Sequence, residues 1–309
     1  MAKPVALTCL RTLTLDKGSR PGRPAHLSAA SGLVRVGNRL YVVADDENHL
    51  GIFPLAGPGP GTLARLSEGK LPLDPGERKR RKRDFESLAH LPAFEDHPNG
   101  ALLALGSCSR PARCEGILAR LDEHGLLDGT LTPVNFTPLR EALEERFGRL
   151  NIEGALTLGD ELILLQRGNK GDRRNARIRF QLARVLESLA AAKRFDAGPL
   201  LGIDLLELGA VGDVPLGISD GAALPDGRMV FTAIAEDTAD SYEDGGCCGA
   251  ALGIVGKGGN VELLEPIDAG YKVEGIEARI EGDSIRVLLV TDADDADVPA
   301  SLLEARLPA

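Results

Sequence analysis

Five polar residues recur at the start of short apolar segments, about 55 to 67 residues apart. They are Ser31, Glu86, Glu153, Ser219 and Glu274. Three carboxylates directed at one point repel one another unless a cation compensates them. Calcium takes about six to eight oxygen ligands and accepts carboxylates, hydroxyls and water together. We therefore predict that these five residues bind Ca²⁺. The alternative is that each acid caps backbone N–H groups or pairs with an arginine of a neighbouring segment.

The loops between the apolar segments are either mainly basic or mainly acidic. Residues 106–113 and 166–174 are basic and rich in glycine. Arginine presents a bidentate fork to phosphate oxygens, so such loops are suited to a small anionic substrate. The alternative for any one loop is a solvated turn. The residues predicted to bind substrate are Arg110, Arg167, Asn169 and Lys170.

Other loops are acidic, at residues 45–48, 236–237 and 292–297. Their carboxylates could hold a second metal ion or accept a proton from water. We take Asp46 and Asp292 as the candidate catalytic bases.

The recurring segments indicate a repeat architecture, because self-similarity at a fixed period is typical of one. Each repeat divides into four short strands, which suits an all-β propeller. We predict a single five-bladed β-propeller domain over residues 1–309. The last repeat lacks a fourth strand, and the apolar segment 5–15 supplies it, closing the ring. Six blades are the alternative, with an additional blade within residues 130–150 or 185–210.

The propeller prediction brings the candidate residues together. The starts of the inner strands and the loops between second and third strands open on one face. Two helical segments, at residues 138–147 and 185–194, interrupt the strands. The basic run at residues 78–83 directly precedes Glu86. It is interpreted as a solvated loop or as a positive patch at the mouth of the channel.

The composition of the chain argues against some classes of binding partner. The 309 residues carry a net charge of −10, which argues against binding nucleic acid. No apolar run reaches the roughly 18 residues needed to span a membrane, and no signal peptide is recognised at the start. We expect a cytoplasmic monomer that acts on a small anionic substrate without contacting a membrane. The five cysteines form no C-x-x-C pair, so a zinc site is not expected.

Several stretches resemble the soluble calcium-activated nucleotidases, or apyrases. Lys272-Val-Glu-Gly-Ile-Glu277 is similar to the family's K-Y-E-G-I-E, and Gly217-Ile-Ser219 to its G-F-S. The segment from Ser31 to Asp46 resembles its S-E-L…L-Y-S-V-D-D, although Glu47 stands where the family has arginine. The inner strands also resemble those of bacterial phytase-like esterase propellers. The resemblance implies a five-bladed propeller with calcium in its channel, held by the five recurring residues.

Three functions follow as expectations. The first is a calcium-dependent hydrolase of phosphoesters or phosphoanhydrides with its site at the channel mouth. The second is a non-catalytic propeller with structural calcium that binds a small ligand or a partner protein. Fold alone does not choose between them. A third expectation is a sugar-lactone or ester hydrolase that uses the same metal.

Overall fold

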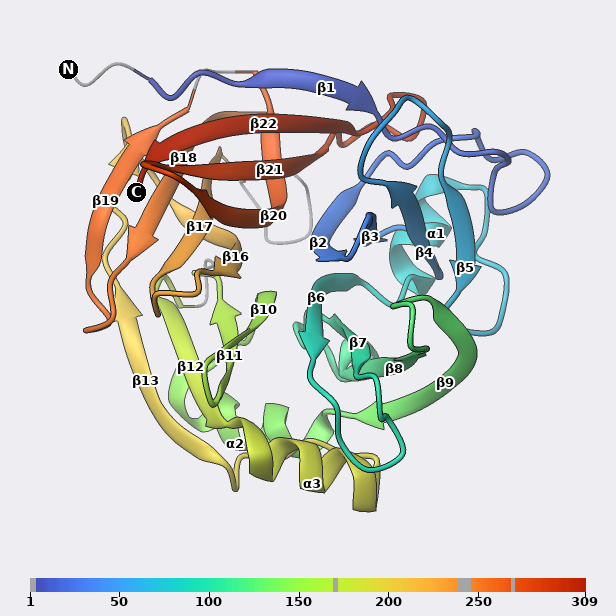
Figure 1. The fold of residues 1–309 in the computed structure, drawn as a ribbon, viewed down its shortest axis with the longest axis horizontal. Helices are drawn as coiled ribbons and strands as arrows, with labels where there is room; N and C mark the ends of the chain where they lie inside the picture. Colours follow the sequence, from blue (N-terminus) through green and yellow to red (C-terminus); the bar gives the residue numbers. More distant parts are fainter. Residues whose placement is uncertain (1–3, 169–171, 238–245, 268–269) are drawn as a thin grey trace.

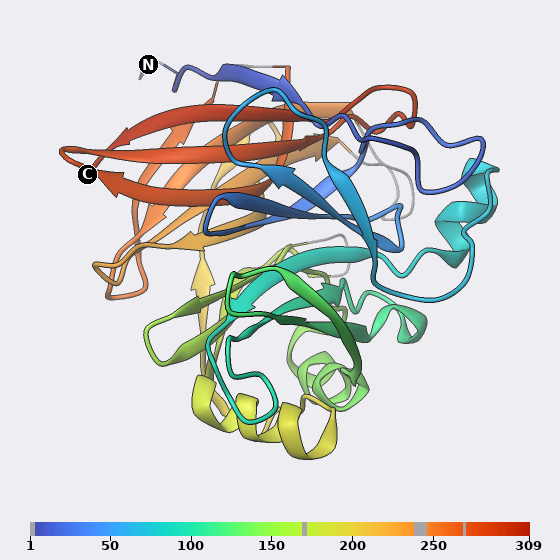
Figure 2. The same ribbon diagram turned by 45° about the vertical axis from the view of Figure 1, so that its right-hand side comes forward.

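The chain folds as a five-bladed β-propeller. The computed structural model describes residues 4–168, 172–237, 246–267 and 270–309. Five four-stranded antiparallel sheets surround a common axis, as the views in Figures 1 and 2 show. The predicted fold class and the prediction of five blades are confirmed.

Each blade runs from an inner strand near the axis to an outer strand at the rim. Blade 1 holds β2 (Ala30–Val36), β3 (Arg39–Ala44), β4 (His49–Pro54) and β5 (Thr62–Arg65). Blade 2 holds β6 (Phe85–Leu91), β7 (Ala101–Gly106), β8 (Glu115–Leu121) and β9 (Leu127–Asn135). Blade 3 holds β10 (Ile152–Leu158), β11 (Glu161–Gln166), β12 (Asn175–Gln181) and β13 (Leu200–Leu206). Blade 4 holds β16 (Gly217–Ala223), β17 (Met229–Asp237), β18 (Gly246–Val255) and β19 (Val261–Pro266).

Blade 5 is completed by both ends of the chain. Its strands from the axis outward are β20 (Lys272–Glu281), β21 (Ser284–Asp292), β22 (Ser301–Pro308) and β1 (Thr8–Thr12). The N-terminal strand β1 pairs antiparallel with β22, so the predicted closure of the ring is confirmed. The inner strand β20 also contacts β2 of blade 1.

Alternating side chains pack each sheet against both neighbouring blades. In β3, Leu40 and Val42 join the apolar cluster shared with blade 5, whereas Tyr41 and Val43 join the cluster shared with blade 2. Successive side chains of a strand point to opposite faces, so a continuous apolar run is what a strand between two blades requires. Within the described residues, every pair of adjacent blades shares such a cluster.

The segments that could have held a sixth blade contain helices and the outer strands β9 and β13 of blades 2 and 3. Helices α2 (Thr137–Phe147) and α3 (Leu182–Ala192) join the core between blades 2 and 3. The second begins three residues earlier than predicted, and it ends two residues earlier because Lys193 takes a left-handed conformation. A two-stranded hairpin, β14 (Ala210–Val211) and β15 (Val214–Pro215), precedes blade 4.

One helix was not predicted. Asp74 caps the N-terminus of α1 (Pro75–Arg81), and this helix holds most of the basic run that was read as a loop. A short 3₁₀ helix, η1 (Pro111–Arg113), lies in the basic loop of blade 2. None of the described helices is long and apolar enough to cross a membrane.

Candidate functional site

The five recurring polar residues occupy β-bulges at the starts of the inner strands. In each blade the register with the second strand skips the recurring residue, as at Glu86 between Phe85 and Ser87. The other skipped positions are Ser31, Glu153, Ser219 and Glu274, the last together with Gly275. A bulge leaves one residue without a cross-strand partner and redirects its side chain. The repeat therefore marks one structurally equivalent position in every blade.

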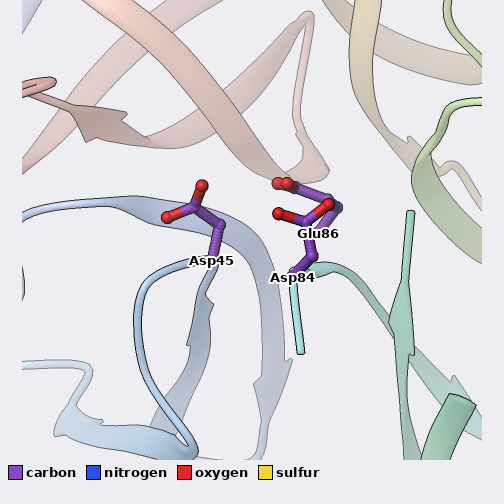
Figure 3. Close-up of side chains that lie close together, drawn as sticks. All are labelled: Asp45, Asp84 and Glu86. Atoms are coloured by element: carbon purple, nitrogen blue, oxygen red, sulfur yellow. The ribbon is translucent and has the colours of Figure 1, made fainter. Parts of the chain in front are cut away.

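Glu86 belongs to a compact carboxylate cluster. Asp45 follows β3, Asp84 precedes β6, and Glu86 is the bulged residue of β6. One carboxylate oxygen from each lies within 4.8 Å of the other two. Figure 3 shows Asp84 and Glu86 side by side, with Asp45 facing them from blade 1. Two blades thus contribute to one cluster of oxygen donors.

Asp84 is held firmly in this cluster. It has a φ of 62°, in the left-handed region that non-glycine residues seldom adopt. Its Oδ2 accepts hydrogen bonds from Ser107 Oγ at 2.5 Å and from Arg113 NH1 at 2.7 Å. The basic loop of blade 2 therefore uses Arg113 to orient an acid of the site. Arg110, the predicted substrate ligand from that loop, is exposed at the N-cap of η1.

Lys82 is the nearest cation to the cluster. It is the C-cap residue of α1, and its Nζ lies 3.0 Å from Asp84 Oδ1 and also contacts Asp45 Oδ2. Glu86 has no hydrogen-bond or ion-pair partner among the described residues. Burial raises the pKa of Glu86 well above its usual value, and the charges of Asp84, Glu153 and Asp45 raise it further. Lys82 and Arg113 therefore supply two positive charges against the three carboxylates of the cluster.

The other side of the ring contains its own cations. Arg167 lies 3.5 Å from Glu153 and 2.8 Å from Glu236. Lys272 Nζ lies 3.0 Å from Glu236 and 3.8 Å from Glu274. Arg167 was predicted to bind substrate, and the structure places it between two acids of the protein.

Even with these ion pairs, burial disfavours the ionised form of the ring carboxylates. Burial raises the pKa of Glu274 well above its usual value, and Lys272 and Arg167 oppose this. Burial also raises the pKa of Glu153, against the charge of Arg167. In the described part of the mouth, carboxylates outnumber cations. The carboxylates are Asp45, Asp84, Glu86, Glu153, Glu236, Glu274 and Asp292, and the cations are Lys82, Arg113, Arg167 and Lys272.

The two predicted serine ligands bond to the protein itself. Ser31 Oγ donates to the carbonyl of Ala29 at 3.3 Å. Ser219 is fully buried, and its Oγ lies within hydrogen-bond distance of Thr232 Oγ1, at 2.9 Å, and of the carbonyl oxygen of Val273, at 3.1 Å. In this arrangement the hydroxyls tie neighbouring backbone segments together.

The two candidate bases lie in different surroundings. Asp46 Oδ2 lies 2.6 Å from Arg23 NH2 and 3.5 Å from Arg78 Nε. Burial and the adjacent Asp45 raise the pKa of Asp46 to about 6. Asp292 Oδ2 lies 3.0 Å from Lys272 Nζ, the same ammonium that approaches Glu274. Asp292 is therefore the candidate closer to the ring. Asn169 and Lys170 lie outside the described residues.

Residues that the sequence analysis missed follow a readable pattern. Two residues before each bulge stand Ala29, Asp84, Asn151, Gly217 and Lys272. Asp84, Asn151 and Lys272 each lie beside the bulged acid of their own blade. Asn151 Nδ2 donates to Glu153, for example. Reading the repeat two residues further upstream would have found Asp84 and Lys272.

Lys82 carries no such signal. It precedes the repeat and lies in a run of basic residues that differ little from one another in sequence. Lys82 contacts the carboxylate cluster because α1 ends at this residue.

Comparison with solved structures finds chains of similar fold at low sequence identity. Glutaminyl cyclase from Myxococcus xanthus is similar over 99% of this chain and 100% of its own, with 10% identity and a TM-score of 0.51. A hypothetical protein from Leishmania major matches over 98% of this chain and 91% of its own, at 10% identity and a TM-score of 0.46. A mannose phosphorylase from Leishmania mexicana, solved with phosphate, matches over 100% and 89%, at 13% identity and a TM-score of 0.45.

Sequence comparison places the chain in a family. No curated protein matches it. Residues 26–307 match the model of a family of unknown function, DUF6929, which covers nearly all of the propeller. The chain therefore belongs to the DUF6929 family.

Proposed function

We propose that the channel mouth binds Ca²⁺ through Asp45, Asp84 and Glu86, and that the site hydrolyses a small phosphoester or phosphoanhydride. The observation that carries the proposal is the approach of the three carboxylate oxygens to within 4.8 Å of one another. Two oxygens bound to one calcium, each at about 2.3–2.6 Å, lie no more than about 5 Å apart. The cluster thus meets the distance requirement with the donor type that calcium prefers.

The charge balance supports the same ion. The pKa of Glu86 is raised by burial and by three neighbouring carboxylates, so a divalent cation would remove an existing repulsion. Glu153 and Glu274, from the equivalent bulges of blades 3 and 5, would add negative potential around it. Lys82 must move away from Asp45 and Asp84 for the ion to bind both. Its side chain has a flexible four-carbon stem, which makes this movement inexpensive.

The remaining residues are assigned by their contacts. A bound calcium would supply charge neutralisation to phosphoryl oxygens. We assign Arg110, which is exposed on the loop that orients Asp84, to the substrate anion. We assign Asp292 as the proton acceptor, because it shares Lys272 with the ring residue Glu274. Asp46 instead forms ion pairs with Arg23 and with Arg78, which belongs to α1.

The ion pairs favour a second candidate, a propeller that binds a ligand without turnover. Lys82, Arg167 and Lys272 already compensate part of the ring charge, as expected where the acids hold the blades together. In this case calcium, if bound, would be structural. The two candidates differ in turnover and in the response of activity to calcium.

Phosphate release from nucleotides, phytate and simple phosphoesters tests the proposal, with calcium and with chelator. The variants are Glu86→Gln and the matched control Glu123→Gln, whose side chain is 80% exposed and does not belong to the carboxylate cluster. We expect calcium-dependent turnover that Glu86→Gln abolishes and Glu123→Gln retains. A calcium-dependent rise in melting temperature without turnover of any substrate supports the ligand-binding propeller. Absence of any calcium effect on melting or turnover contradicts the metal site.

A further inference from the structure

A cavity lies at the end of the channel opposite the carboxylate ring. It has a volume of about 660 Å³ and is lined by all five inner strands. Its lining begins at Leu33, Leu88, Ala155, Gly221 and Ile276, each two residues beyond a bulged ring residue. A volume of this size suits a small organic ligand.

The inner part of this cavity is apolar. Ala222 and Ala278 line it together with Leu33, Leu88 and Ile276. Between this cavity and the ring lies one layer of residues, formed by Gly32, Ser87, Gly154, Asp220 and Gly275. The cavity is therefore chemically separate from the charged mouth.

The outer part of the cavity is lined by two arginines, Arg35 and Arg279, and by one glutamate, Glu277. Arg35 is half-buried in the wall, and its Nε donates only to the carbonyl of Gly37, at 3.1 Å. It has no carboxylate within ion-pair distance among the described residues, whereas the neighbouring Arg279 lies 2.7 Å from Glu277. Burial lowers the pKa of Arg35, and the positive charge of Arg279 acts in the same direction, against the negative charge of Glu277. An anion beside Arg35 would relieve both effects.

We infer that this cavity binds an amphipathic monocarboxylate. The apolar body of the ligand occupies the space between the five inner strands, and its carboxylate pairs with Arg35 at the outer end. An apolar molecule without a charge would leave Arg35 uncompensated. A small hydrophilic anion would leave the apolar walls in contact with water. The inference concerns the opposite end of the channel and does not depend on calcium or hydrolysis at the mouth.

Titration calorimetry with decanoate, kept below its micellar concentration, tests the inference on the full chain. Acetate and 1-decanol are the comparison probes, each lacking one half of the proposed recognition. We expect saturable one-to-one binding of decanoate, with both other probes binding at least tenfold more weakly. Binding of 1-decanol as tight as that of decanoate overturns the role of the charge. Binding of acetate as tight overturns the role of the apolar walls.

Three variants locate the site. Arg35→Gln should weaken decanoate binding by roughly tenfold or more, as expected for loss of a charge-assisted hydrogen bond. Arg39→Gln is the matched control, because Arg39 is exposed on the same hairpin and does not line the cavity. Ala222→Phe should weaken decanoate binding, because the added ring takes up part of the apolar space between the inner strands. Equal decanoate affinity in the wild type and in Arg35→Gln overturns the inference even if Ala222→Phe fails to fold.

Discussion

The carboxylate of Asp220, in blade 4, accepts a hydrogen bond of 3.1 Å from the backbone N–H of Ile276, in blade 5. Ile276 follows the bulge of β20, where the register leaves Glu274 and Gly275 without partners. Asp220 occupies the layer in which the other blades have only glycine or serine. One acid therefore fills the centre of the propeller and satisfies backbone donors that the bulges leave open.

Replacement of Asp220 should separate its hydrogen bonds from its charge. Burial raises the pKa of Asp220 well above its usual value, although the N–H groups of Gly221, Ile276 and Leu33 oppose this. A raised folded-state pKa gives stability that is present below the unfolded pKa of about 3.9 and is lost as pH rises through the folded value. Asp220→Asn cannot ionise, so it should gain stability relative to the wild type as pH rises. Urea unfolding at pH 5 and pH 8 measures this difference.

Asp220→Ala is the companion variant for that series. It removes the acceptor and should cost about 1–3 kcal/mol at both pH values, since buried N–H groups lose their partner. Parallel pH dependence of the wild type and Asp220→Asn would show that the carboxyl does not titrate differently in the folded protein.

The layer around Asp220 should not tolerate added methyl groups. A Cβ on Gly275 would lie 2.8 Å from the backbone N of Leu33, so the inner strands of blades 5 and 1 would have to separate. Gly275→Ala should lower stability by about 1–3 kcal/mol, the usual cost of overpacking. Gly59→Ala is the control, because its nearest contact would be Pro54 at 3.9 Å. Equal melting temperatures for the two variants would contradict close packing at the axis.

The fold was predictable because its physical requirements repeat. Every blade needs an apolar strand near the axis, and each such strand carries a bulge at a polar residue, so Ser31, Glu86, Glu153, Ser219 and Glu274 recur in step. Closure of the ring was also readable, since the last repeat lacked a strand that the N-terminus could supply. These features depend on hydrophobic pattern and order along the chain.

The partners of the charged residues were less predictable. Arg167 meets Glu236 from the next blade, and a contact between distant residues leaves no local mark in one sequence. Lys82 reaches Asp45 and Asp84 only because α1 ends at that point. The helix was not predicted, because its basic residues were interpreted as a loop. The position of the ring followed from the repeat, whereas its charge balance required the three-dimensional contacts.

Arg167 should be essential for stability rather than only for substrate binding. It lies between Glu153 and Glu236, and its removal leaves both carboxylates in a buried setting without this cation. Arg167→Met should cost about 3–5 kcal/mol, as when one partner of a buried ion pair is lost. The double variant Arg167→Met/Glu153→Gln should recover part of the loss in urea unfolding. Full additivity of the two substitutions would contradict direct coupling.

Lys82→Met should distinguish a metal site from an internal ion pair. Without the ammonium, Asp45, Asp84 and Glu86 repel one another. In the presence of a chelator, the variant should therefore melt at a lower temperature than the wild type. Calcium should then bind more tightly than in the wild type, since no lysine competes for the same oxygens, and should produce a larger rise in melting temperature. Lys70→Met, at an exposed lysine outside the cluster, controls for loss of one positive charge. A destabilised Lys82→Met variant that calcium does not rescue would identify Lys82 as the permanent counter-ion of these carboxylates.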